Sequence, residues 1–266
     1  MSVPLAVFVV LFWWFQAPAV RSDTLIVMTS GAFTAAFEEL APVYERAGHG
    51  TVVAAITTMG TGAESIASRL RRREPADVVI VPAESLDSFI NAGVVVAASR
   101  IELARSSIAM AVRAGSHHPD ISSADALKRA LLEARSVAYS ASVSGDYLVN
   151  ELFPRLGIAE PMKAKARRID RERVGAVVAR GEAEIGFQQL SELLPIPGVD
   201  VVGVLSEDVQ RVTTIAAGVA THSQHPDAAR AFIRFLASPA AAAIVKQTGM
   251  NPIASVRDRE WVDGMR

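Results

Sequence analysis

The spacing of apolar residues along the chain changes repeatedly between that of a strand and that of a helix. Residues 24–29 (TLIVMT) are a β-branched run typical of a buried strand, and after a short turn apolar residues recur at helical spacing as far as Tyr44. Residues 51–58 and 77–81 predict two more strands, each followed by a helical pattern. This alternation predicts an α/β fold with a mostly parallel sheet flanked by helices.

A second series of alternating elements begins near residue 108 and predicts a second lobe. Its expected elements are strands 108–113, 136–140, 164–169 and 183–187 and helices 123–134, 146–156 and 171–180. The chain then continues with strands 201–205 and 212–219 and helices 226–237 and 239–248. Because no further strand–helix unit follows, we expect this last part to return to the first lobe. The predicted lobes are residues 23–107 plus 209–266 and residues 108–208.

The N-terminal residues have the pattern of an export signal. Residues 3–20 are mostly apolar, and Ala17-Pro18-Ala19 matches the small-x-small pattern of a cleavage site. No Lys or Arg precedes the apolar run, and roughly 20 apolar residues are also long enough to form an uncleaved anchor. We therefore expect a signal peptide over residues 1–22 and a periplasmic protein, with cleavage and anchoring both left open.

Charge and composition exclude several classes of function. Lys+Arg 27 and Asp+Glu 28 give a net charge of −1 without a basic half, so no nucleic-acid footprint is present. The chain has no cysteine, which excludes disulfides and thiolate metal sites. The 5 histidines lack metal-ligand spacing, and neither a phosphate-binding loop nor a G-x-S-x-G elbow occurs. We expect no nucleic-acid partner, no metal site and no cofactor.

Small and polar residues stand at four predicted strand ends, where a helix begins. Ligands of open α/β sheets bind at such places, because the helix presents unpaired backbone N–H groups. Hydroxyl and amide side chains can bind an anion there without burying a second charge. The alternative is that these residues are ordinary helix N-caps. The candidate ligand-binding residues are Ser30, Gly31, Gly60, Thr61, Ser142, Val143, Ser144, Gln188 and Gln189.

One arginine stands out because of its position in a predicted helix. Arg171 lies at the beginning of the helix over 171–180, the end at which the helix dipole disfavours a cation. This position favours a carboxylate partner in the cleft, and a plain surface role is the alternative.

The sequence resembles the molybdate-binding type of bacterial periplasmic solute-binding protein over nearly all of the chain after residue 23. The stretches TTMGTGAESIASRLRRREPADVVIVPAESLDSFINAGVV and HPDAARAFIRFLASPAAAAIVKQTG carry most of the likeness. The resemblance implies the type II periplasmic-binding fold, with a ligand cleft between two lobes and ligand contacts from Ser30, Thr61, Ser142 and Val143. One departure is Gln189, because molybdate binders have a tyrosine there, and it favours a carboxylate ligand over molybdate.

The stretches SGAF, SVAYSASVSGDYL and IGFQQLSEL also resemble a divergent branch that contains a periplasmic aconitate isomerase. Two functions therefore stay open. In the first, a monomer clamps a small anion, a tricarboxylate or an oxyanion, and delivers it to an ABC permease. In the second, the same cleft interconverts trans- and cis-aconitate by proton transfer, which needs a base. Candidates for the catalytic groups are Asp146, Tyr147, Glu192 and Arg171.

Overall fold

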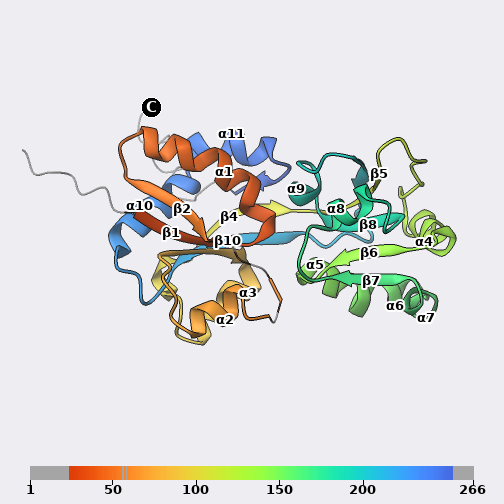
Figure 1. Ribbon diagram of the computed structural model, residues 1–266, viewed down its shortest axis with the longest axis horizontal. Helices are drawn as coiled ribbons and strands as arrows, with labels where there is room; N and C mark the ends of the chain where they lie inside the picture. Colours follow the sequence, from red (N-terminus) through yellow and green to blue (C-terminus); the bar gives the residue numbers. More distant parts are fainter. Residues whose placement is uncertain (1–23, 56, 58, 61, 254–266) are drawn as a thin grey trace, which may run out of the picture.

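The chain forms two lobes that lie side by side along the long axis of the molecule (Figure 1). The computed structural model describes residues 24–253 apart from residues 56, 58 and 61, so the signal peptide expected over residues 1–22 lies outside the described residues. Each lobe contains one sheet with helices on its faces. The predicted two-lobed α/β architecture is therefore confirmed.

The first lobe is built on a six-stranded sheet with the order β11-β4-β10-β3-β1-β2. Its central strands β1 and β3 are parallel, and β10 runs antiparallel to both β3 and β4. All five residues of β3 (VVIVP) are buried, as expected for a strand covered by helices on both faces. The strands are β1 (Thr24–Thr29), β2 (Thr51–Ala55), β3 (Val78–Pro82), β4 (Ile101–Ser106), β10 (Thr213–Val219) and β11 (Asn251–Pro252).

Two hydrophobic clusters fill the faces of this sheet. Helix α1 buries Phe33, Phe37, Leu40 and Tyr44, as the helical spacing of the sequence predicts. Helices α1, α10 and α11 cover one face, whereas α2 and α3 cover the other (Figure 1). These helices are α1 (Gly31–Arg46), α2 (Ile66–Arg71), α3 (Ala83–Asn91), α10 (Pro226–Leu236) and α11 (Pro239–Gln247), with a short 3-10 turn at Ala97–Ser99.

The second lobe has a five-stranded sheet with the order β7-β6-β8-β5-β9. Strand β6 is parallel to β7 and β8, and β5 is antiparallel to β8 and β9. The strands are β5 (Ile108–Arg113), β6 (Val137–Ser140), β7 (Ala166–Ile169), β8 (Ile185–Gln189) and β9 (Val199–Val204). The helices are α4 (Ala124–Glu133), α5 (Val143–Tyr147), α6 (Phe153–Arg155), α7 (Ala159–Lys163), α8 (Val174–Ala179) and α9 (Leu190–Leu193), and a π-helical turn, Leu148–Leu152, joins α5 to α6.

The chain passes twice between the sheets. It leaves the first sheet at Ser107, between β4 and β5, and returns between β9 and β10. Strand β4 was not among the predicted elements, because Glu102 and Arg105 interrupt its apolar pattern. Helix α5 begins at Val143, three residues before the predicted start at residue 146, and the backbone N–H of Asp146 donates to Ser142 O at 2.9 Å. The end of β6 therefore passes almost directly into a helix at the boundary between the lobes.

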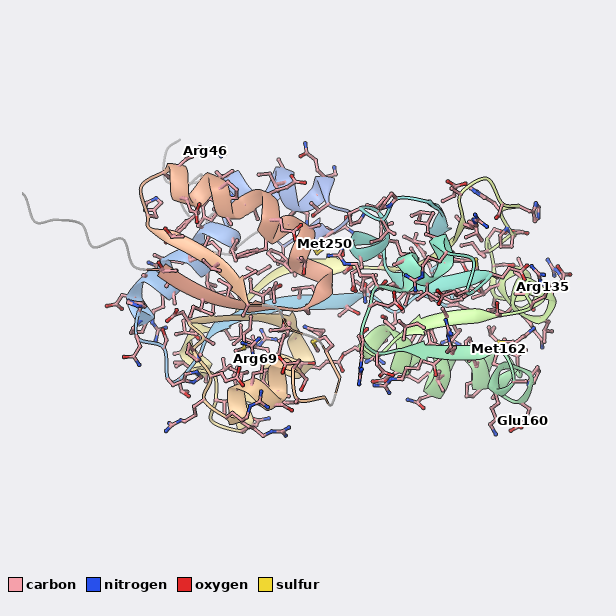
Figure 2. The ribbon with its side chains drawn as sticks, in the orientation of Figure 1. Arg46, Arg69, Arg135, Glu160, Met162 and Met250 are labelled. Atoms are coloured by element: carbon pink, nitrogen blue, oxygen red, sulfur yellow. The ribbon has the colours of Figure 1, made fainter. Side chains whose placement is uncertain are left out.

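Charged side chains mark the outer ends of the molecule. Figure 2 shows Arg46 at the outer end of α1 and Arg135 and Glu160 at the opposite end, in the second lobe. Among the described residues no single helix is long and apolar enough to cross a membrane. The pair α10 and α11 meets the criteria of length and composition only when the two are taken together, and they are bent by 64°.

Candidate functional site

A cavity of about 360 Å³ lies between the two lobes. The first lobe contributes the turn between β1 and α1, and the second contributes the turn between β6 and α5, the loop before α8 and the end of β8. Of the residues predicted from the sequence, those that line the cavity are Ser30, Gly31, Ser142, Val143, Ser144, Arg171, Gln188, Gln189 and Glu192. Residues from three of the four predicted strand ends therefore meet at one place.

Ser30 presents an unpartnered hydroxyl at this cavity. Its backbone N–H donates to Ile80 O at 2.8 Å, which holds the turn against β3. The residue is the N-cap of α1, yet its side chain makes no capping hydrogen bond, and its buried Oγ has no partner among the described residues. A buried hydroxyl without a partner is costly, so a ligand acceptor would satisfy it. The N-cap alternative does not explain this side chain.

Three serine hydroxyls form a ring at the start of α5. Ser140 Oγ lies 2.8 Å from Ser142 Oγ and 3.1 Å from Ser144 Oγ, and the last two are 3.1 Å apart. Gly145 lets the start of α5 lie close to the end of β6, because a Cβ there would overlap the carbonyl oxygen of Ser140. Each hydroxyl can turn its proton toward an acceptor in the cavity. The ring is thus a set of neutral donors for an anionic group.

Gln189 links the second lobe to β10 of the first. Its Nε2 donates to Thr213 Oγ1 at 3.0 Å, while its buried Oε1 has no partner among the described residues. Because Thr213 lies far along the chain, no local pattern in the sequence predicts this contact. Gln189 thus offers a second unpaired polar atom at the cavity that Ser30 lines.

Glu192 is a buried carboxylate at the wall of the cavity. Helix α9 carries it to the boundary between the lobes (Figure 1), where Ser191 Oγ donates to Ala32 O of α1 at 2.8 Å. Gln188 Nε2 donates to Glu192 Oε2 at 2.6 Å. Burial raises the pKa of Glu192 to about 7, against the opposing effects of the Arg173 charge and the Gln188 hydrogen bond. This carboxyl can therefore gain and lose a proton near neutral pH.

Gly31 makes room for that carboxylate from the opposite lobe. A Cβ at position 31 would overlap Glu192 Oε2 and lie 2.9 Å from Glu192 Cδ. The glycine has no left-handed φ, so the turn itself does not require it. The close approach of the carboxylate is the physical reason for a glycine at this position.

Two arginines supply positive charge at the cavity. Arg171 and Arg173 line it from the loop before α8, and neither forms an ion pair within 4 Å among the described residues. Arg168, by contrast, pairs with Asp170 at 3.0 Å. The lining also carries carboxylates, which are those of Glu38, Asp170, Glu172 and Glu192. Arg171 and Arg173 are the groups suited to pair with carboxylates of a ligand.

Two of the predicted catalytic residues are not brought to the cavity. Asp146 is exposed, and the Tyr147 hydroxyl donates to Val209 O at 2.9 Å within the core of the second lobe. Asp146 lies in the first turn of α5, but its side chain is exposed, and Tyr147 is buried in the core instead of lining the cavity. Gly60 does not line the cavity although its neighbour Met59 does, and Thr61 lies outside the described residues.

The structure adds lining residues that the sequence pattern did not single out. Ser140 is the last residue of a strand and completes the serine ring, and Thr213 arrives with the return of the chain to the first lobe. In the described part of the chain, no group of three or more His, Asp or Glu side chains is arranged to hold a metal ion.

Residues 25–251 match the family of bacterial extracellular solute-binding proteins, and the chain belongs to this family. The fold is shared with the periplasmic molybdate-binding protein of Azotobacter vinelandii, with a TM-score of 0.66 and 19% identity over 85% of this chain and 98% of that one. The sulfate-binding protein SubI of Mycobacterium tuberculosis H37Rv gives a TM-score of 0.67 at 16% identity, covering 90% of each chain.

A much more similar relative is the aconitate isomerase of a Pseudomonas species. It is 48% identical over 231 residues, which cover 86% of this chain and 88% of the relative. The resemblance to molybdate-type solute-binding proteins, and to a branch with an aconitate isomerase, is thus confirmed for family and fold.

Proposed function

We propose that this protein is an aconitate isomerase in which Glu192 is the base. The observation that carries the proposal is a buried carboxyl at the cavity wall whose pKa is raised by burial to about 7. A site that only binds an anion would gain nothing from a buried carboxylate beside that anion. A general base, by contrast, works best when its pKa lies near the operating pH. The 48% identity to an aconitate isomerase supports the same assignment.

The remaining lining groups match a substrate with three carboxylates. Arg171 and Arg173 are the cations available for one or two of them, and the serine ring and the Ser30 hydroxyl are neutral donors for another. Neutral donors keep the total positive charge low, so the ionised form of Glu192 is not overstabilised and stays basic.

The reaction needs one proton to leave one carbon and return to another. Glu192 takes a proton from the methylene carbon of trans-aconitate, and the electrons of that C–H bond move into the allylic system and its carboxylates. Glu192 then returns the proton to the former vinyl carbon, and the double bond shifts by one position. One C–H bond breaks and one forms, so the atoms balance without another reactant. The conformation about the bond between the methylene and central carbons when the proton leaves sets the geometry of the new double bond. A conformer with the two carboxylates of that bond on the same side gives the cis product.

We propose the remaining organisation as follows. Residues 1–22 direct export to the periplasm, and the protein acts there as a monomer. Residues 23–107 plus 209–266 form one lobe and residues 108–208 the other, so that the substrate lies between them. Delivery of an anion to an ABC permease is the second candidate function, and it is favoured by the Ser30 hydroxyl and the serine ring, which would hold an anion equally well without turnover.

The test is incubation of the purified protein with trans-aconitate or cis-aconitate, followed by proton NMR of the mixture. We expect the wild type to convert each isomer into the other and Glu192→Gln to lose at least about 10²-fold in rate, as for removal of a general base. Asp146→Asn is the matched control, because Asp146 is exposed and outside the cavity lining, and it should keep the wild-type rate.

Two other outcomes contradict the proposal. Full activity of Glu192→Gln would show that another group moves the proton. Calorimetric binding of aconitate, molybdate or sulfate by the wild type without any conversion of aconitate would assign the protein to solute binding alone.

A further inference from the structure

The side chain of Gln188 is fixed at both ends, which distinguishes it from the other polar groups of the cavity. It is buried at the end of β8, and its Oε1 accepts a hydrogen bond from the backbone N–H of Val174 at 2.9 Å. Its Nε2 donates to Glu192 Oε2 at 2.6 Å. Both ends of this amide are therefore held within the protein, and Gln188, which the sequence pattern placed among the ligand-binding residues, also lines the cavity.

The orientation of this amide follows from its two partners. The Val174 N–H can only donate, and an ionised carboxylate can only accept. Turning the amide over would set donor against donor at Val174 and acceptor against acceptor at Glu192. Buried mismatches of that kind are costly, so only one orientation is stable. The direction of the hydrogen bond to Glu192 is thus determined by the start of α8.

This hydrogen bond makes the two oxygens of Glu192 inequivalent. Oε2 lies between Gln188 Nε2 and the backbone at Gly31, whereas Oε1 accepts no hydrogen bond from any of the described residues. When the carboxyl is protonated, its carbonyl oxygen is a stronger acceptor for the amide than its hydroxyl oxygen. The hydrogen bond to Oε2 therefore favours protonation of Oε1.

We propose that Gln188 is the positioning residue of the base, holding Glu192 Oε2 so that Oε1 is the atom that takes and returns the substrate proton. This inference rests on the proposed isomerase function for its catalytic meaning. In this role Gln188 acts through Glu192, so the titration of that carboxyl is what tests it.

Other charged groups near Glu192 also influence the titration of its carboxyl. Arg173, at the N-cap of α8, favours the Glu192 anion by its charge. The remaining charged residues that line the same cavity are Glu38 of α1 and Asp170, Arg171 and Glu172 of the loop before α8. None of these hydrogen-bonds Glu192, so loss of the Gln188 donor is a specific perturbation of this carboxyl.

The experiment compares wild type with Gln188→Met, which keeps the length of the side chain but has neither donor nor acceptor. The pKa of Glu192 is measured by NMR titration with ¹³C-labelled glutamate carboxyls, and the isomerase rate is measured across pH. Loss of a hydrogen bond to a charged group should raise that pKa by about one unit and move the acid limb of the rate profile equally. At pH 6 the rate should fall about 10-fold, with recovery at high pH.

A purely structural role would give a different result. It would lower the rate by the same factor at every pH and leave the Glu192 pKa unchanged, which would overturn the proposal. Gln189→Met is the control for the titration, because it removes a neighbouring buried amide that bonds Thr213 and not Glu192. Its Glu192 pKa should match that of the wild type.

A measurement on the wild type alone decides the matter if Gln188→Met does not fold. The side-chain amide protons of Gln188 should shift with pH and follow the Glu192 titration. Amide signals that do not change through that titration would overturn the proposal. Because neither NMR titration requires turnover, absence of isomerase activity would contradict the proposed function while leaving the role of Gln188 to be decided by the titrations.

Discussion

Replacing Gly31 with alanine should test the contact between the start of α1 and the Glu192 carboxylate. The new Cβ would overlap Glu192 Oε2 and lie 2.9 Å from Glu192 Cδ, closer than Cβ atoms approach other atoms in proteins. The carboxylate must therefore retreat by roughly 1 Å, a misplacement that can cost about 10²-fold in rate. We expect Gly31→Ala to lower isomerase activity by about that factor.

The effect of Gly31→Ala on the free energy of unfolding should change sign when Glu192 is replaced. With Glu192 present, withdrawal of the carboxylate from Gln188 loses a charge-assisted hydrogen bond worth about 1.5–3 kcal/mol. The better helix propensity of alanine returns roughly 0.5–1 kcal/mol, so the net loss is about 0.5–2.5 kcal/mol. With Glu192→Ala in the background no overlap exists, and Gly31→Ala should stabilise the protein by up to about 1 kcal/mol.

The assay is urea unfolding of the wild type, the two single variants and the double variant, with isomerase rates measured on the same preparations. Gly62→Ala is the control, because no atom lies within 4 Å of a Cβ placed there and Gly62 does not line the cavity. Wild-type activity and stability for Gly31→Ala would refute the placement of Glu192 against the start of α1.

Two further predictions concern stability and ligand affinity. Ser30→Ala removes a buried hydroxyl that has no partner among the described residues. In urea unfolding the unliganded protein should therefore be unchanged or more stable by about 1 kcal/mol, while KM for aconitate rises. A clear loss of stability would mean that the hydroxyl forms a structural hydrogen bond. Glu192→Gln should be more stable than wild type by about 3 kcal/mol at pH 8, because the Glu192 pKa is raised from 4.5 to about 7. The folded state binds the extra proton between these values, so the contribution of Glu192 to wild-type stability is greatest below pH 4.5 and is lost as pH rises through about 7. Thermal unfolding from pH 4 to 8 checks this, and a constant difference across that range would contradict it.

The strand–helix alternation was enough to predict the two sheets, because most strands are continuous apolar runs between helical patterns. Strand β4 was missed because Glu102 and Arg105 interrupt its apolar pattern. The strand forms nevertheless, because it pairs with β10. The start of α5 was misplaced because Ser142-Val143-Ser144-Gly145 has the composition of a turn, whereas Val143 is already helical.

The choice among Asp146, Tyr147 and Glu192 could not be made from the sequence. All three stand near predicted strand ends, and only the tertiary structure shows that Asp146 is exposed, that Tyr147 lies in the core and that Glu192 lines the cavity. The raised pKa of Glu192 depends on burial at the boundary with the first lobe, next to Gly31, a residue far away in the chain. Local pattern carries no information about such a contact.

The pH dependence of kcat/KM for trans-aconitate tests most directly whether a buried Glu192 moves the proton. The acid limb of this profile reports the pKa of the essential base in the free enzyme. Because the ionised carboxylate is the active form and burial raises the Glu192 pKa to about 7, the rate should rise with pH to a plateau above that value. A wild-type rate that is already at its plateau at pH 5, or one that Glu192→Gln reproduces, would contradict the account.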